Sequence, residues 1–256
     1  MFNLLNNIWL KSFLITLCLL GAFMILGEIQ YSWTLPESKC LSDGYCQCEQ
    51  IDRSKLISEP INTYSSLFYF YIGLVVFFHA SKIGYRRGGV LVLVCASFVT
   101  AGSIFYHASA SQLGVALDFL GITMILSVFA IWRNFASTKY LRNIILSIII
   151  SISTFVAVLM SEYIGLILIP QILILIYSLY ILKQELKYFD LQNINKNLYY
   201  FLAVYILGGS CWFIANTPGL CDPDSIVQFH SLWHFFGATA IFFSYKYLME
   251  TGEVMV

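Results

Sequence analysis

One stretch of the chain, GSIFYHASASQLGVALDFLG at residues 102–121, places a hydroxyl, an imidazole and a carboxylate within otherwise apolar sequence. Ser103 and His107 are four residues apart, so both side chains lie on one face of a helix. Asp118 follows about one turn into the next apolar segment. Ionisable groups in such segments are energetically expensive and usually face a cavity or a partner. The spacing therefore predicts a polar site in this part of the chain.

A second motif, HSLWH at residues 230–234, opens the last apolar segment. His230 and His234 are also four residues apart and share a helix face. Together with His107 they can form a three-histidine site with an open fourth position, which is the usual plan of a catalytic zinc site. Asp118 stands on the segment that hairpins back from His107, where a carboxylate can accept a proton from water.

Other functions fit parts of this pattern and stay open. The HxxxH pair can bind haem or line a polar seam, and Asp118 can act as a proton relay or bond to an interhelical hydroxyl. Ser103 alone is a common packing residue in membrane helices. A transporter is expected to have polar groups distributed over the depth of the bilayer, whereas here they gather at one depth. A structural zinc site prefers four protein ligands, whereas here three histidines are accompanied by Ser103 and Asp118. Both observations favour a hydrolytic site. His79 ends another segment at the opposite face, where we expect an interfacial anchor.

The composition is that of an integral membrane protein. Of 256 residues, 59% are hydrophobic and only 11% are charged, whereas a soluble domain is about one quarter charged. Apolar runs of roughly 18 to 20 residues recur, each long enough to cross a bilayer as a helix. The net charge is zero and no basic cluster indicates a nucleic-acid partner. We predict an all-α polytopic membrane helix bundle in contact with the lipid bilayer.

Eight apolar segments are expected, at 12–30, 60–80, 89–108, 114–132, 143–161, 163–182, 198–216 and 227–248. The first follows Lys11 as in a signal peptide, but no small-x-small cleavage site is clear, which favours an uncleaved signal anchor over a cleaved leader. The long connection that follows it is polar, acidic and rich in cysteine, so we place it outside the lipid.

The basic residues predict the orientation. If all eight segments span, 11 of the 14 Lys and Arg residues fall on one side, and the other three are Lys39, Arg53 and Lys55. The side with more basic residues is normally cytoplasmic. The carboxyl terminus is then cytoplasmic, and the predicted polar site lies near the non-cytoplasmic face.

Four cysteines also fall on the non-cytoplasmic side: Cys40, Cys46, Cys48 and Cys221. In an oxidising compartment they allow three pairings, with free thiols as the alternative. We expect at least one bridge, tying the loop at 31–59 to Cys221.

At these residues the sequence resembles the alkaline ceramidase family. The stretch 102–121 and the motif HSLWH resemble the two zinc motifs of that family, and SEPINTYSSLFYF (58–70) resembles the opening of its first core helix. The family belongs to a wider group of membrane hydrolases that includes the adiponectin and progestin receptor-like proteins. The resemblance covers most of residues 48–248, and the combination of S-x3-H, H-x10-D and H-x3-H is specific.

The resemblance implies a role for each residue of the predicted site. His107, His230 and His234 would hold Zn²⁺, Asp118 would orient and deprotonate water, and Ser103 would contact the reacting carbonyl. The implied reaction is hydrolysis of the amide bond of a ceramide-like N-acyl lipid to a fatty acid and a sphingoid base. A hydrolase of other lipids and a receptor-like protein with a structural zinc are the alternatives.

The resemblance also implies the domain organisation. The family core has seven spans, so the first segment of this chain is an addition. The expected parts are a signal anchor or extra transmembrane helix, a non-cytoplasmic acidic loop, a seven-helix hydrolase core and a cytoplasmic tail, at 1–31, 32–59, 60–248 and 249–256.

Two further features follow from the resemblance at the start of the core. Cys48 and Cys221 look like the family's disulfide. Eukaryotic members also carry an acidic Ca²⁺ cluster here, and Glu49 and Glu59 match two of its positions, whereas the residues just before Cys48 differ from the family's Asp and Trp. Two interpretations of Glu49 and Glu59 therefore stay open: a calcium site, or a solvated acidic loop without a bound ion.

Overall fold

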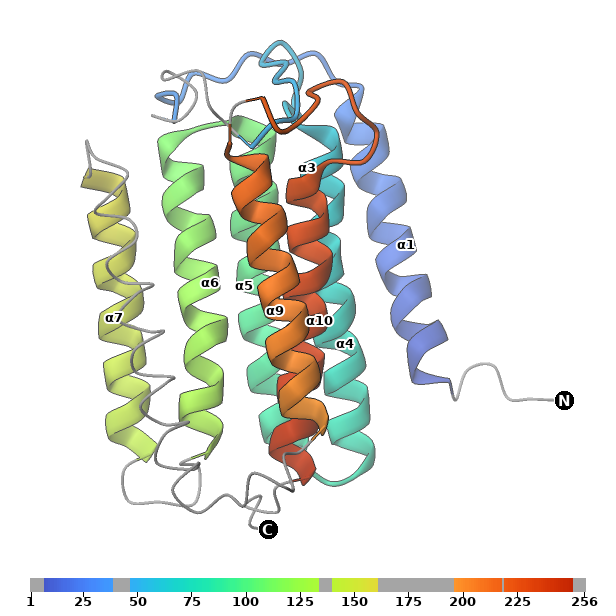
Figure 1. The fold of residues 1–256 in the computed structure, drawn as a ribbon, viewed down its shortest axis with the longest axis vertical. Helices are drawn as coiled ribbons and strands as arrows, with labels where there is room; N and C mark the ends of the chain where they lie inside the picture. Colours follow the sequence, from blue (N-terminus) through green and yellow to red (C-terminus); the bar gives the residue numbers. More distant parts are fainter. Residues whose placement is uncertain (1–6, 39–46, 134–139, 161–195, 218, 251–256) are drawn as a thin grey trace, which may run out of the picture.

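The protein is a bundle of α-helices (Figure 1). The computed structural model describes residues 7–38, 47–133, 140–160, 196–217 and 219–250. Its helices are α1 (Ile8–Gly27), α3 (Pro60–Ser65), α4 (Leu67–Lys82), α5 (Arg86–Ser109), α6 (Gln112–Arg133), α7 (Tyr140–Met160), α9 (Lys196–Ala215) and α10 (Phe229–Glu250). Within those ranges the only β-pairing is two isolated bridges. The predicted all-α fold class is therefore confirmed.

The helices fall where the apolar segments predicted them, with ends that differ by a few residues. The expected segment 163–182 lies outside the described residues. Four described helices are long and apolar enough to cross a membrane: Ile8–Gly27, Pro60–Lys82, Arg86–Ser109 and Lys196–Ala215. The chain therefore has the helices of a membrane protein, while the number of spans, the orientation and the domain divisions stay predictions.

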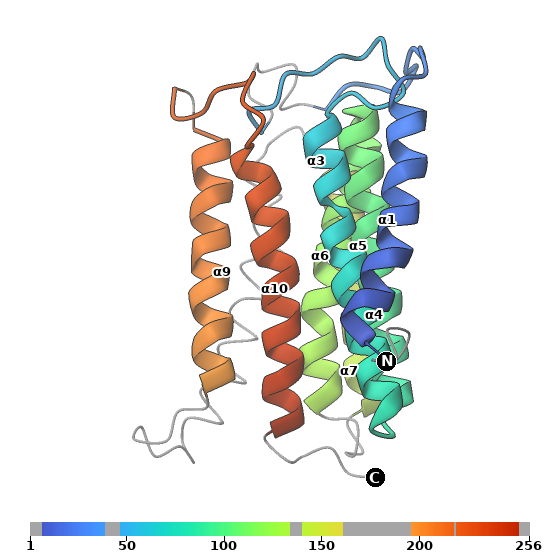
Figure 2. The ribbon, with the colours of Figure 1, turned by 90° about the vertical axis from the view of Figure 1, so that its right-hand side faces the viewer.

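The long helices stand side by side: α1, α4, α5, α6 and α7 alternate in direction, and α9 and α10 run antiparallel to each other (Figures 1 and 2). α1 and α5 finish at one end of the bundle, and α3, α6 and α10 begin there; we call it the loop end. α5 packs against α4 and α6, and α10 packs against α9 and α4. Residues far apart in the sequence, at the end of α5 and the start of α10, therefore meet at the loop end.

The interior of the bundle changes character along its length. A core of apolar side chains lies between α4, α5, α6 and α10, with Val76 and Val99 fully buried. Toward the loop end the buried residues become polar, and they include Ser58, Glu59, Asn62, Ser66, Ser103 and His107. Buried polar groups cost free energy unless they are paired, so we infer that the polar residues at this end form a functional site and do not serve packing alone.

Two glycines let α5 and α6 lie in close contact. A Cβ atom at Gly102 would lie 2.4 Å from the carbonyl oxygen of Leu117, and one at Gly121 would lie 2.6 Å from the Cα atom of Val99. Small residues at helix interfaces permit this approach in membrane proteins. The short distance between the backbones puts Asp118 of α6 beside α5.

The N-terminal helix α1 is attached to the bundle at both of its ends. Near its start the Trp9 ring contacts the rings of Tyr71 and Phe242, at centroid distances of 6.1 and 5.2 Å. At its last residue, Gly27, the backbone passes close to the Tyr64 hydroxyl. An apolar cavity of about 460 Å³ lies between these contacts and is lined by residues of α1, α4 and α5. Most large side chains of α1 are exposed, as expected of a helix that faces lipid.

Candidate metal centre

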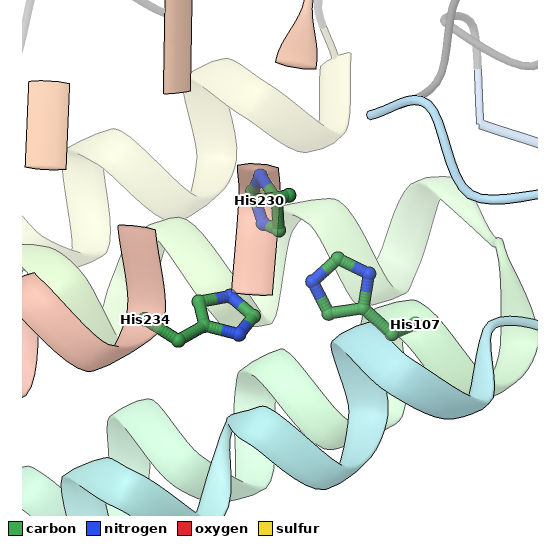
Figure 3. Close-up of side chains that lie close together, drawn as sticks. All are labelled: His107, His230 and His234. Atoms are coloured by element: carbon green, nitrogen blue, oxygen red, sulfur yellow. The ribbon is translucent and has the colours of Figure 1, made fainter. Parts of the chain in front are cut away.

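Three buried histidines meet at the loop end of the bundle (Figure 3). His107 comes from the last turn of α5, and His230 and His234 come from the first two turns of α10. The ring centroids are 4.9 Å apart for His107 and His230, 5.2 Å for His107 and His234, and 4.6 Å for His230 and His234. One nitrogen from each ring can be chosen so that all three lie within 4.8 Å of one another, close enough to hold one metal ion.

The hydrogen bonding of these rings fits a metal ion. Within the described residues, Nε2 of His107 and both nitrogens of His230 are buried without a hydrogen-bond partner. Unpaired buried polar atoms of this kind are rare and costly. A divalent cation bound by three imidazoles would satisfy these nitrogens and leave a coordination position open, as in catalytic zinc sites.

Backbone contacts fix the end of α5 and with it His107. The last carbonyl groups of an α-helix have no partner within the helix. Here the N–H groups of Ser58 and Glu59 donate to the carbonyl oxygens of Ala108 and His107, each at 3.0 Å. The loop before α3 is thereby held directly over the candidate metal centre.

Glu59 is the partner of the other His107 nitrogen. Its Oε2 lies 2.6 Å from Nδ1 of His107, and both side chains are fully buried. Burial raises the pKa of Glu59 to about 8, against a hydrogen bond from Asn62 that lowers it. A carboxylate on the far nitrogen orients a histidine ring and leaves Nε2 free to face a metal.

Ser103 and Asp118 lie next to the three histidines. The Ser103 hydroxyl is 3.3 Å from Nε2 of His234 and 3.0 Å from the hydroxyl of Ser66. It also interacts with the carboxyl group of Asp118, which is buried on α6. The structure thus brings together all five residues that the two sequence motifs singled out.

Glu49 has a structural contact at the start of α3. Its two carboxylate oxygens accept the N–H groups of Ile61 and Asn62 at 2.7 and 2.8 Å, which satisfies two donors at a helix N-terminus. Burial raises the pKa of Glu49 to about 7, although these two hydrogen bonds lower it. Glu49 and Glu59 therefore both have protein partners, and calcium binding by them stays a prediction.

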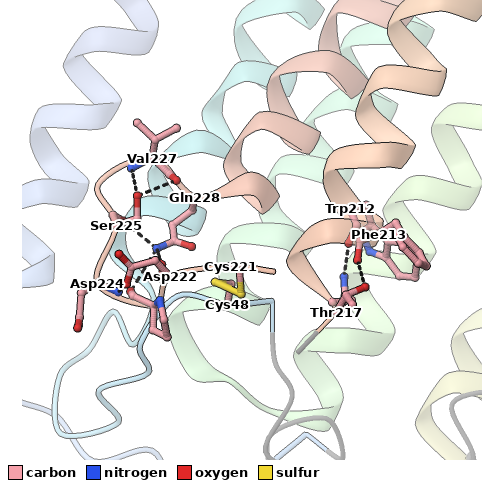
Figure 4. Close-up of a disulfide and its surroundings, with 12 residues drawn as sticks. Cys48, Trp212, Phe213, Thr217, Cys221, Asp222, Asp224, Ser225, Val227 and Gln228 are labelled. Carbon is pink, nitrogen blue, oxygen red and sulfur yellow. Dashed lines mark hydrogen bonds between the residues drawn. A yellow bond between two sulfur atoms is a disulfide. The ribbon is translucent and has the colours of Figure 1, made fainter. Parts of the chain in front are cut away.

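A disulfide joins the loops that precede α3 and α10 (Figure 4). Cys48 and Cys221 are bonded, with Cα atoms 6.0 Å apart and a sequence separation of 173. The amide of Gln228 donates to the carbonyl of Ser225 at 2.7 Å and so folds the segment between Cys221 and α10. The bridge from the acidic loop to Cys221 is confirmed, while Cys40 and Cys46 lie outside the described residues.

His79 is separate from this group, as the sequence predicted. Its Nδ1 is 2.6 Å from the hydroxyl of Tyr245, which comes from the far part of α10. This contact explains the residue without a metal.

Three site residues were missed by reasoning from the sequence: Asn62, Ser65 and Ser66. Ser65 contacts His234, Ser66 contacts Ser103, and Asn62 contacts Glu59. Their spacing of i, i+3 and i+4 at the start of an apolar segment was the available signal, because it places three polar side chains on one helix face.

An all-helical bundle with helices of membrane-spanning length and a buried three-histidine group at one end defines a class of membrane proteins with a candidate metal site. A comparison with protein-family models matches the family described as Ceramidase over residues 46–252. The chain therefore belongs to the ceramidase family, which implies a hydrolase. The match begins after α1, so this helix lies outside it. A search of curated proteins finds no match to the chain.

Proposed function

We propose that this protein is a zinc-dependent amidase that hydrolyses ceramide-like N-acyl lipids in the membrane, giving a fatty acid and a sphingoid base. The observation that carries the proposal is the set of buried, unpartnered histidine nitrogens beside a buried carboxyl group and a hydroxyl. Membership of the ceramidase family supports the lipid substrate class.

His107, His230 and His234 would hold the zinc ion. When bound there, zinc would supply a Lewis acid that polarises a carbonyl group and makes water more acidic. The remaining chemistry falls to residues of the chain itself.

Asp118 is the general acid and base of the proposed reaction. Its carboxylate accepts a proton from water as the water oxygen attacks the amide carbon. When the C–N bond breaks, the protonated Asp118 returns that proton to the leaving amine, so that fatty acid and amine are released and Asp118 is regenerated. A carboxyl group in this role must lie within hydrogen-bond reach of the reacting atoms, and the interaction of Asp118 with Ser103 holds it at the site.

Ser103 is placed to stabilise the carbonyl oxygen. Its hydroxyl lies among Ser66, His234 and Asp118 and can turn its hydrogen toward an oxygen that gains negative charge. Removal of one such donor typically costs about 3 kcal/mol of transition-state stabilisation.

The position of the site suits a lipid substrate. The histidines are buried at the loop end of the bundle, and the apolar helices extend from there along its length. Each methylene of an acyl chain that leaves water contributes about 0.8 kcal/mol. The excess of basic residues at the other end supports a non-cytoplasmic position for the site.

The proposal is tested with purified protein and a mixture of N-acyl lipids. We expect mass spectrometry to show a fatty acid and a sphingoid base from ceramide, with about one zinc ion per chain by elemental analysis. His230→Ala should lose both zinc and turnover, whereas His79→Ala should keep both. A wild-type protein that binds no zinc, or that cleaves none of the lipids, would refute the proposal.

A further inference from the structure

The Ser65 hydroxyl makes two contacts that together determine where its hydrogen lies. Ser65 is buried, and its Oγ lies 2.9 Å from the carbonyl oxygen of Asn62 and 2.8 Å from Nδ1 of His234. A serine hydroxyl has a single hydrogen, and a carbonyl oxygen can only accept. The hydrogen therefore points to Asn62, and the contact with His234 is made by a ring N–H that donates to the Ser65 oxygen.

This hydrogen bond selects one form of His234. A neutral imidazole carries its hydrogen on either Nδ1 or Nε2. With Nδ1–H donated to Ser65, the lone pair is on Nε2, the nitrogen 3.3 Å from the Ser103 hydroxyl. The centroid of the same ring lies 5.2 Å from that of His107 and 4.6 Å from that of His230. The ring is thus held in the form that a metal ion requires.

Asn62 supports this arrangement from several sides. Its carbonyl oxygen accepts the hydroxyls of Ser65 and Ser66, both at 2.9 Å, and the Asn62 backbone also interacts with the His234 ring. Its side-chain amide donates to Oε2 of Glu59 at 3.0 Å. Since Glu59 contacts His107, one residue touches the partners of histidines from both α5 and α10.

The local backbone explains how one residue can do this. The first core segment is interrupted at Ser66, between α3 and α4. Pro60 opens α3, and Glu49 fixes the N–H groups of Ile61 and Asn62. The short helix is therefore anchored at its start and places its polar face against the candidate metal centre.

We propose that Ser65 and Asn62 are positioning residues of the metal centre, which hold His234 with its hydrogen on Nδ1 and direct Nε2 at the ion. The inference rests on the proposed zinc site and assigns the two residues no contact with the substrate.

The test compares zinc affinity in Ser65→Ala, Ser65→Thr and Ser244→Ala, measured by competition with a chelator. Ser244 is a matched control because it is a buried serine of α10 whose hydroxyl bonds only to the Ala240 carbonyl, among the contacts the structure describes. We expect Ser65→Ala to weaken zinc binding by about tenfold, at the low end of the ~10–100-fold range for residues that orient a ligand. Ser65→Thr, which keeps the hydroxyl, should bind zinc with the wild-type affinity. Ser244→Ala should also bind zinc with the wild-type affinity. Thermal unfolding of the zinc-free proteins should show the same midpoint for Ser65→Ala and Ser244→Ala.

A second measurement observes the position of the hydrogen directly in the wild-type protein. Nitrogen-15 NMR of zinc-free protein with labelled histidine should show the His234 hydrogen on Nδ1, with the signal assigned by its absence in His234→Gln. A hydrogen on Nε2, or unchanged affinity in Ser65→Ala while wild-type protein binds zinc, would overturn this inference and leave the proposed function intact. Failure of the wild-type protein to bind zinc would instead overturn the proposed function.

Discussion

The carboxylate of Glu59 lies 2.6 Å from Nδ1 of His107, with both side chains fully buried at the point where the loop before α3 crosses the end of α5. The backbone of the same residue bonds to the His107 carbonyl. Glu59 thus fixes both the ring and the main chain of a candidate metal ligand.

Removal of this carboxylate should weaken metal binding. We expect Glu59→Ala to lower zinc affinity by roughly 10–100-fold, because Nδ1 of His107 loses the acceptor that orients the ring. Competition with a chelator measures the change. Glu37→Ala, which removes a carboxylate paired with Arg53 in the loop, is the control and should bind zinc normally. Equal affinities in the two variants would contradict the role of Glu59.

Asp118→Asn should separate metal binding from turnover. The substitution keeps the size of the side chain but removes its ability to accept a proton, so we expect full zinc content and a loss of roughly 10²–10⁴ in kcat. Elemental analysis and a ceramide hydrolysis assay on the same preparation measure both quantities. Asp224→Asn, at an exposed loop position, should leave both unchanged. Near-normal turnover in Asp118→Asn would remove Asp118 from the chemistry.

Gly102→Ala should disturb the site through the helix backbone. The new Cβ atom would meet the Leu117 carbonyl oxygen at 2.4 Å, so α5 and α6 must move apart, at a cost of about 1–3 kcal/mol. Asp118 follows Leu117 and would move away from Ser103. We expect a lower unfolding temperature and reduced turnover. Gly209→Ala on α9, where the added atom meets nothing within 4 Å, is the matched control.

Glu49 should make stability depend on pH. Burial raises its pKa from an ordinary value of 4.5 to about 7, so between these values the folded protein binds more protons than the unfolded chain. The contribution of Glu49 to the free energy of unfolding should therefore fall as the pH rises from about 4.5 to 7. Chemical denaturation of wild-type protein and of Glu49→Gln in calcium-free buffer measures this contribution, and wild-type protein should lose stability relative to Glu49→Gln over that range. A difference between the two proteins that stays constant with pH, or that changes in the opposite direction, would refute the prediction.

Loss of the disulfide should destabilise the loop end. Removal of a native bridge typically costs about 2–5 kcal/mol, and this bridge closes a separation of 173 residues. We expect Cys48→Ser to unfold at lower temperature than Cys18→Ser, which alters a free, exposed cysteine. Zinc affinity should fall with it, since Glu49 is adjacent to Cys48 and holds the start of α3. Unchanged melting in Cys48→Ser would contradict this coupling.

The helices and the shared position of the three histidines could be predicted from the sequence, because each of these predictions rests on a local pattern. An apolar run of membrane length predicts a helix, and two histidines four residues apart share a face whatever the rest of the chain does. The alternation of helix direction then places His107 and His230 at the same end.

The hydrogen-bond partners of these histidines could not be predicted from local patterns. Glu59 is 48 residues from His107, and Ser65 is 169 residues from His234. Such contacts depend on how α3 is seated and on the break at Ser66. The spacing of Asn62, Ser65 and Ser66 predicts a shared helix face but not which histidines that face contacts. The pairing of Cys48 with Cys221 likewise came from family resemblance, since the four cysteines alone allowed three arrangements.

In the predicted orientation, the bridge between Cys48 and Cys221 would also link the insertion of the chain to the assembly of the candidate metal centre. Structural disulfides form in oxidising compartments and are rare where glutathione keeps thiols reduced. A chain threaded into the bilayer with the opposite polarity would expose both thiols to reducing conditions and leave the entrances to α3 and α10 unlinked. Formation of this one disulfide would therefore require the correct orientation of the chain in the membrane and would also hold the histidine cluster in place.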